Sequence, residues 1–179
     1  MNNEVDIKDK RFEIFISEDE ITSIVTDVSN RINNSGIKDP VFIAVLNGSF
    51  LFAADIMRKI IIPNTEISFI KLSSYSGTKA TGSVQKLIGL RQNIRNRNIV
   101  ILEDIVDTGI TLEKIILLLK KENVADIKIA TLLFKPDAYT KEIPIDFIGK
   151  SIANNFVVGY GLDYNEIGRN LSHIYKLKE

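Results

Sequence analysis

Short apolar runs alternate along this chain with segments in which apolar residues recur every three or four positions. Runs of four to eight apolar residues are typical of buried strands, and the wider spacing is typical of one face of a helix. The pattern therefore predicts strands and helices in alternation. The predicted strands cover residues 41–46, 67–72, 84–90, 98–103, 127–134, 145–148, 156–158 and 173–177.

The clearest predicted helix follows Ser17. Ser17 and Glu20 have the spacing of a capping box, in which two side chains satisfy N–H groups at the start of a helix. Apolar residues recur at helical spacing over residues 21–32, and the Asn-Asn-Ser-Gly sequence that follows ends the helix. The other predicted helices are residues 50–61, which Pro63 ends, and a segment that begins near residue 111.

Alternating strands and helices predict an α/β fold, with a mostly parallel sheet covered on both faces. No linker or composition shift divides the 179 residues, so we expect a single domain over residues 1–179. Ligands in such sheets bind beyond the carboxyl ends of the strands. Residues 73–83 are polar and contain two glycines, which is typical of a mobile loop. Three turns would share the ligand-binding rim, namely residues 47–48, 107–111 and 135–137.

Composition narrows the classes of partner. Lys+Arg and Asp+Glu both number 23, so the chain lacks the basic excess of a general nucleic-acid binder. The first fifteen residues contain no apolar stretch of the kind that a signal peptide needs. The apolar runs are far shorter than the roughly 20 residues that span a bilayer. We therefore expect a cytoplasmic protein that binds neither nucleic acid nor a membrane.

The chain contains no cysteine and one histidine, His173. This excludes disulfides, thiolate nucleophiles, cysteine-based zinc sites and a metal centre with several histidines. A metal ion here should be a hard cation with oxygen ligands, and Mg²⁺ is the first candidate.

The candidate chemistry is concentrated in the sequence Ile-Leu-Glu-Asp-Ile-Val-Asp-Thr-Gly-Ile-Thr-Leu at residues 101–112. A buried strand ends in Glu103 and Asp104, and Asp107 precedes a turn at the start of a helix. Gly109 lets the backbone approach a ligand closely, and the helix start offers N–H groups and a positive dipole end to an anion. The string matches neither a Walker A loop nor a dinucleotide fingerprint. It predicts a phosphate site beside carboxylates suited to ribose hydroxyls, Mg²⁺ or a proton.

This string closely resembles the phosphoribosyl pyrophosphate (PRPP) motif of type I phosphoribosyltransferases, in the form found in hypoxanthine-guanine phosphoribosyltransferases. The resemblance runs from about residue 10 to the end of the chain, in the family's order. Three more segments carry it: Leu-Asn-Gly-Ser-Phe at residues 46–50 resembles the pyrophosphate loop, residues 74–75 with 81–82 resemble the ends of the flexible catalytic loop, and residues 156–169 resemble the purine hood.

The resemblance implies the type I phosphoribosyltransferase fold. Its mostly parallel twisted sheet is flanked by helices, its small hood would comprise about residues 1–15 and 150–179, and its mobile loop about residues 73–83. It implies a purine salvage enzyme, a pentosyltransferase that joins the 5-phosphoribosyl group of PRPP to N9 of hypoxanthine or guanine. The products would be IMP or GMP and pyrophosphate. The implied cofactor is Mg²⁺, and the implied assembly is a homodimer or homotetramer.

Carried over residue by residue, the resemblance implies roles around the PRPP motif. Glu103 and Asp104 would hold the ribose hydroxyls and an adjacent Mg²⁺, and Asp107 would be the general base at purine N7. The residues that would cradle the 5′-phosphate are Thr108, Gly109, Ile110 and Thr111.

The remaining roles concern the purine, the pyrophosphate and the second metal ion. Lys135 would donate to the purine 6-oxo group, Phe156 would stack on the ring, and the Val157 backbone would read its edge. Asp163 would lie at the purine and help to bind a second Mg²⁺, and Arg169 would contact pyrophosphate. Leu46, Asn47 and Gly48 would form the pyrophosphate loop, with a cis Leu46–Asn47 peptide bond. Ser74 and Tyr75 would lie on the closing loop.

The chain departs from the family pattern at four positions. Asn47, Ile110 and Asn155 stand where some members carry lysine, and Ser49 stands where some carry a second glycine. Phosphate binding through backbone groups is compatible with all four. Two other functions remain open at this point: a non-catalytic regulator that senses PRPP, and a phosphoribosyltransferase for another base.

Overall fold

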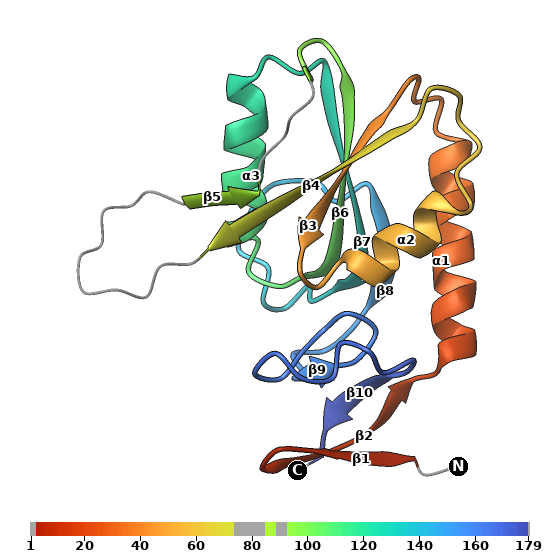
Figure 1. Cartoon of the computed structure of the whole chain (residues 1–179), viewed down its shortest axis with the longest axis vertical. Helices are drawn as coiled ribbons and strands as arrows, with labels where there is room; N and C mark the ends of the chain where they lie inside the picture. Colours follow the sequence, from red (N-terminus) through yellow and green to blue (C-terminus); the bar gives the residue numbers. More distant parts are fainter. Residues whose placement is uncertain (1–2, 74–84, 89–92, 179) are drawn as a thin grey trace.

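The computed structural model describes residues 3–73, 85–88 and 93–178, which form two sheets and three helices (Figure 1). No helix in these ranges is both long enough and apolar enough to cross a membrane. The strands of the larger sheet are β3 (Val41–Leu46), β4 (Glu66–Ser73), β5 (Gln85–Ile88), β6 (Asn98–Val106), β7 (Asp126–Phe134) and β8 (Phe147–Ser151). Their order across the sheet is β5-β4-β3-β6-β7-β8.

The larger sheet confirms the predicted α/β fold. Across this sheet, the pairs β4–β3, β3–β6, β6–β7 and β7–β8 are parallel. Among the described residues of the sheet, only the β4–β5 pair is antiparallel. Helices α1 (Glu18–Asn33) and α2 (Phe50–Met57) cover one face, and α3 (Ile110–Lys121) covers the other (Figure 1). Because successive strand residues point to opposite faces, Leu102 joins the core under α1 and α2 while Ile101 joins the core under α3.

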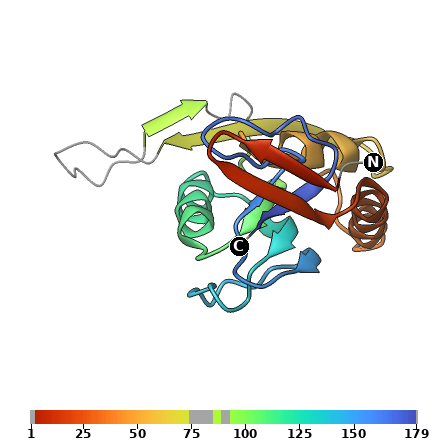
Figure 2. The ribbon, with the colours of Figure 1, turned by 90° about the horizontal axis from the view of Figure 1, so that it is seen from below.

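Both ends of the chain build the smaller, antiparallel sheet. Its strands, in the order β1-β2-β10-β9, are β1 (Glu4–Ile7), β2 (Lys10–Ile16), β10 (Ile174–Leu177) and β9 (Val157–Val158). It has its own apolar core around Phe12 and Val158. The parallel strands of the larger sheet end on the side that faces it (Figure 1). Seen from below in Figure 2, the β1–β2 hairpin lies across the end of the molecule between α1 and α3.

Several predicted boundaries were wrong. The pattern did not indicate β1 and β2, and it extended the second helix to residue 61. That helix ends at Met57 because the turn tightens there, with the Lys59 N–H donating to the Ile56 carbonyl three residues back. Strand β6 continues to Val106, three residues beyond the predicted end at 103, so that Glu103 and Asp104 lie inside the strand.

The start of α1 differs from the predicted capping box. The Ser17 hydroxyl accepts from the Glu20 N–H at 3.2 Å, as expected, but the Glu20 carboxylate accepts from Lys150 Nζ at 2.7 Å. A second cap comes from His173, whose Nδ1 accepts from the Glu18 N–H at 2.8 Å. The only histidine of the chain therefore ties the segment before β10 to the start of α1.

We expect His173→Ala to lower the free energy of unfolding by about 1 kcal/mol, because the Glu18 N–H loses its acceptor. His173→Asn should keep most of that stability, since an amide oxygen can take the place of Nδ1. Urea unfolding of the three proteins measures the difference. Equal midpoints for wild type and His173→Ala would mean that water replaces the imidazole without cost.

Candidate active site

Three turns lie together at the carboxyl edge of the larger sheet. They follow β3, β6 and β7, which are adjacent and parallel, so the predicted shared rim is confirmed. The turn after β3 approaches β6 closely: a Cβ added at Gly48 would collide with the Asp104 carboxylate. Glycine is required there because the acid occupies the space of a side chain.

The two acids of β6 carry unusual electrostatics. Glu103 is only 6% exposed, and burial followed by the neighbouring Asp104 charge holds its pKa well above the usual range. Burial also raises the pKa of Asp104 to about 6, against the opposing effect of backbone N–H donors and of Arg169. Asp163 pushes the pKa of Asp104 in the same direction as burial does. The edge of the sheet thus concentrates poorly solvated negative charge.

This charge fits the predicted cation. Among the described residues, no three acidic or histidine side chains gather into one cluster, so Glu103, Asp104 and Asp163 do not form a closed metal cage. Mg²⁺ commonly takes one or two carboxylates and completes its shell with water and substrate oxygens. The donor set is made of oxygens and is open, which is what such an ion needs.

We expect Asp104→Asn to stabilise the protein when no ligand is bound. The pKa of Asp104 in the folded protein exceeds its ordinary value, so the folded state holds this proton more tightly than the unfolded state does. The free energy of unfolding of wild type should therefore fall as the pH rises from 3.8 to about 6. At neutral pH the amide removes this cost, worth about 1–2 kcal/mol after allowance for partial exposure. The melting temperature should therefore rise by about 3–6 °C.

Thermal melts of both proteins across pH measure this effect. The gap between Asp104→Asn and wild type should close toward acid pH, where both side chains are neutral. A melting temperature for the variant below that of wild type at neutral pH would contradict the electrostatic account.

The turn after β6 is shaped to receive an anion. Gly109 has φ of +81°, which favours glycine, and α3 begins at the next residue. The turn encloses a hollow of about 90 Å³ lined by Glu103 and residues 105–112. The first N–H groups of a helix have no partner within the helix, so they can bind phosphate oxygens in this hollow.

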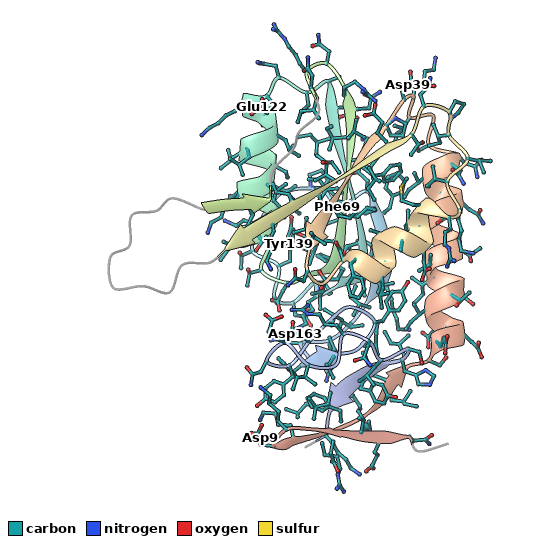
Figure 3. The ribbon with its side chains drawn as sticks, viewed as in Figure 1. Asp9, Asp39, Phe69, Glu122, Tyr139 and Asp163 are labelled. Carbon is teal, nitrogen blue, oxygen red and sulfur yellow. The ribbon has the colours of Figure 1, made fainter. Side chains whose placement is uncertain are left out.

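The connection between β7 and β8 holds this turn from outside. The backbone N–H and the hydroxyl of Thr140 both donate to the Thr108 carbonyl, at 3.3 and 3.1 Å. Lys141 Nζ pairs with Glu113 of α3 at 2.8 Å. Tyr139, which is labelled in Figure 3, packs against Gly109. These three residues were not predicted from the sequence. Nothing local marks them, because their contacts join segments about 30 residues apart.

Ile110 illustrates one of the departures from the family pattern. Its side chain is 48% exposed, so it does not support the turn by packing. The turn is instead fixed by backbone bonds and by the β7–β8 connection, including the Lys135 N–H that donates to the Val106 carbonyl at 3.0 Å. The geometry of this turn thus does not depend on a lysine at position 110.

Asp107 and Lys135 meet above the turn. Lys135 Nζ donates to Asp107 Oδ2 at 3.0 Å, and its side chain is only 10% exposed while that of Asp107 is 44% exposed. A largely buried ammonium is held by one accessible carboxylate. The pair therefore presents a proton donor and a proton acceptor side by side.

An accessible aromatic platform lies in the smaller sheet. Phe156 is 46% exposed, although its ring touches those of Phe12 and Tyr164 at centroid distances of 6.2 and 5.8 Å. Val157, the next residue, is buried, and its strand β9 pairs with β10. A flat molecule can thus stack on Phe156 beside a fixed backbone edge.

The segment after β9 returns to the rim. Arg169 pairs with Asp163 at 2.7 Å and with Glu166 at 3.1 Å, and it donates to the Gly161 carbonyl at 2.9 Å. Figure 3 shows Asp163 between the two sheets. Gly161 packs so closely on the Gly48 carbonyl that a Cβ there would collide with it. The C-terminal part of the chain is therefore in direct contact with the turn after β3.

The turn after β3 agrees with the family pattern in shape. The Leu46–Asn47 peptide bond is cis, as the resemblance implies. The buried Ser49 hydroxyl donates to the Val45 carbonyl at 2.6 Å, so its side chain turns back onto β3 and away from the rim. Ser74 and Tyr75, assigned to the closing loop, lie outside the described residues.

Comparisons with known proteins agree with this geometry. The family model described as phosphoribosyl transferase domain matches residues 17–165. A hypoxanthine-guanine phosphoribosyltransferase from Staphylococcus epidermidis is 41% identical over 167 residues, which make up 92% of this chain and 93% of the relative.

Solved structures show the same fold. A hypoxanthine phosphoribosyltransferase from Staphylococcus aureus superposes with a TM-score of 0.84 at 38% identity, covering 93% of this chain and 91% of that one. A hypoxanthine-guanine phosphoribosyltransferase from Bacillus anthracis, solved with a HEPES molecule in its active site, gives 0.85 at 36% identity, covering 93% and 98%. The chain therefore belongs to the phosphoribosyl transferase family, in the group formed by the hypoxanthine-guanine phosphoribosyltransferases.

Proposed function

We propose that this protein is a cytoplasmic purine salvage enzyme that transfers the 5-phosphoribosyl group of PRPP to N9 of a 6-oxopurine, hypoxanthine or guanine. The observation that carries the proposal is the contact of Lys135 Nζ with Asp107 Oδ2 at 3.0 Å. The contact places the Lys135 ammonium, which can only donate hydrogen bonds, beside the Asp107 carboxylate, which accepts them. Both lie at the rim that includes the turn at residues 107–111. A 6-oxopurine with a proton on N7 presents the complementary pair, a carbonyl oxygen and an N–H.

The purine would bind between the platform and this pair. Phe156 would stack on the ring, and stacking of a base on an aromatic side chain contributes about 1–3 kcal/mol. Lys135 would donate to the 6-oxo group. Adenine has an amino group in that position, which also donates, so Lys135 would find no acceptor there. The Val157 backbone and Asp163 would face the opposite edge of the base.

The transfer exchanges one bond at C1′ for another and moves one proton. The C1′–O bond of PRPP breaks with its electron pair going to the pyrophosphate oxygen, and N9 of the purine bonds to C1′. The proton on N7 passes to the Asp107 carboxylate, which keeps the product base neutral. Donors that stabilise the leaving group lower the barrier to this step.

PRPP would lie along the rim between three groups of residues. Residues 108–111 would hold the 5′-phosphate, Glu103 and Asp104 the ribose hydroxyls, and residues 46–48 with Arg169 the pyrophosphate. When bound, Mg²⁺ would neutralise charge on the pyrophosphate oxygens, held by carboxylates among Glu103, Asp104 and Asp163. The raised pKa values of Glu103 and Asp104 support this, since a cation relieves poorly solvated charge.

The smaller sheet with residues 159–173 would form the hood over the purine, within a single domain. Residues 73–83 would close over the site and exclude water, which otherwise competes for PRPP. We also propose a homodimer or homotetramer. The resemblance to the family supports this assembly. Light scattering of the purified protein measures the assembly.

The proposed reaction is tested by turnover with PRPP, Mg²⁺ and one base at a time: hypoxanthine, guanine, xanthine or adenine. Formation of nucleotide and of pyrophosphate is followed in parallel. Turnover of hypoxanthine or guanine and not of adenine is expected. Turnover of adenine or a pyrimidine instead would assign another base to the same chemistry. Binding of PRPP without turnover of any base would favour the regulator that senses PRPP.

A further inference from the structure

Three consecutive residues after β9 have positive φ angles. They are +106° at Gly159, +48° at Tyr160 and +98° at Gly161. Glycine adopts such angles freely, but a bulky residue such as tyrosine rarely does. Tyr160 is also buried, at 7% exposure. A residue keeps an unfavourable backbone conformation only where its surroundings fix it, and such positions often have a functional reason.

The side chain of Tyr160 supplies a contact that glycine could not. Its hydroxyl donates to Asp55 Oδ2 at 2.6 Å, and its backbone N–H donates to the Leu171 carbonyl at 2.8 Å. Burial and the Asp55 charge raise the pKa of the Tyr160 phenol, so it remains a donor at any physiological pH. Asp55 belongs to α2, the helix that starts directly after residues 46–49.

The next residue completes the connection. Gly161 packs directly on the carbonyl of Gly48, in the turn to which the proposed function assigns pyrophosphate. Tyr160 thus contacts α2, the helix that follows this turn, and Gly161 contacts the turn itself. The same segment leads back, through β9, to Val157 at the proposed purine edge.

We propose that Tyr160 is a positioning residue, whose hydrogen bond to Asp55 fixes the hood segment against the turn at residues 46–49 and so sets the geometry in which pyrophosphate binds. The inference rests on the proposed function of the two sites. Tyr160 acts through Gly161 and Gly48, without touching either substrate.

The effect of losing this bond should fall on the pyrophosphate side. Val157 is held independently by the pairing of β9 with β10. Phe156 is likewise held by the Leu177 N–H, which donates to its carbonyl at 2.9 Å. The turn at residues 46–49 is short, and the hood is a direct neighbour of its backbone at Gly48. Loosening the hood contact therefore frees the turn more than it frees the purine platform.

The first test is Tyr160→Phe, which removes only the hydroxyl. We expect KM for PRPP, and KM for pyrophosphate in the reverse reaction, to rise about 3–10-fold, the range that loss of one hydrogen bond produces. KM for hypoxanthine should change by less than about twofold, since its contacts remain. Tyr175→Phe is the matched control, because Tyr175 is a buried tyrosine of the hood strand β10.

The partner residue provides the second test. Asp55→Ala removes the acceptor and should behave like Tyr160→Phe, whereas Asp55→Asn keeps an oxygen acceptor and should stay close to wild type. Both variants lose the same ion pair with Arg58, at 3.6 Å, so that loss cancels in the comparison. The double variant Tyr160→Phe/Asp55→Ala should be no worse than Tyr160→Phe alone, because both remove one shared interaction.

Melting temperatures separate a folding defect from the proposed role. A folded Tyr160→Phe protein with unchanged KM for PRPP and pyrophosphate would overturn the inference. Equal rises in KM for PRPP and hypoxanthine would overturn it as well, because a general loosening of the hood would then explain them. If wild type itself lacks turnover, the proposed function fails, and the inference is then tested by calorimetric affinity for pyrophosphate in wild type and Tyr160→Phe.

Discussion

Asp107→Asn is expected to lower kcat by about 10²–10⁴, the usual range for a positioned acid–base group. The amide cannot accept the N7 proton, so charge would build up on the purine as N9 attacks. Asparagine has the same shape and still offers Lys135 an oxygen at the 3.0 Å position, so the fold and the rim should persist. Steady-state turnover with PRPP and hypoxanthine measures the loss, and KM for PRPP should change little.

Asp27→Asn is a suitable control, since Asp27 of α1 also pairs with a cation, Arg31 at 2.8 Å, and lies outside the three turns of the rim. It should leave kcat near the wild-type value. An Asp107→Asn enzyme within about threefold of wild type would remove Asp107 as the base, because a positioned base contributes far more than that.

Lys135→Gln should reduce kcat/KM for hypoxanthine by about 10–100-fold, the scale of losing a hydrogen bond from a charged donor. The buried ammonium is the proposed partner of the 6-oxo group, and glutamine is shorter and neutral. Affinity for PRPP, measured by calorimetry without base, should be nearly unchanged. Discrimination against adenine should also weaken, because the amide can accept as well as donate.

Lys150→Gln is the matched control. Lys150 also pairs with a carboxylate, that of Glu20 at 2.7 Å, but it lies in β8 and contacts α1. This substitution should change neither kcat/KM for hypoxanthine nor the affinity for PRPP. Equal losses of both in Lys135→Gln would show that the lysine supports the rim as a whole and has no purine-specific role.

The strand, turn and helix around the acids were predictable because local signals determine them. The apolar run before Glu103 specifies a buried strand, and Gly109 and the apolar spacing after it specify a turn and a helix. The closeness of the turns at residues 47–48 and 107–111 was also predictable, because the carboxyl ends of parallel strands lie at one edge of the sheet. In this segment only the extension of β6 to Val106 was not predicted, because two consecutive acids after an apolar run indicated that the strand ended there.

Contacts between distant segments were not predictable. Tyr160 and Asp55 are 105 positions apart, and His173 and Glu18 are 155 positions apart. Periodicity and capping rules describe one element at a time and contain no information on such pairs. The pairing of β2 with β10 was not predictable for the same reason, because it joins residues about 160 positions apart.

The strand order of the smaller sheet has a consequence for how the protein is made. Strand β10 comes last among the strands of the described residues, yet it lies inside its sheet, between β2 and β9. On the ribosome, the residues of α1, α2, α3 and the larger sheet are all made before β10, so the aromatic platform must wait until residues 174–177 have been synthesised. A premature stop codon shortly before Ile174 would leave β2 and β9 without the strand that joins them. Such a truncated product would keep the residues at the rim and lose the support beneath Phe156.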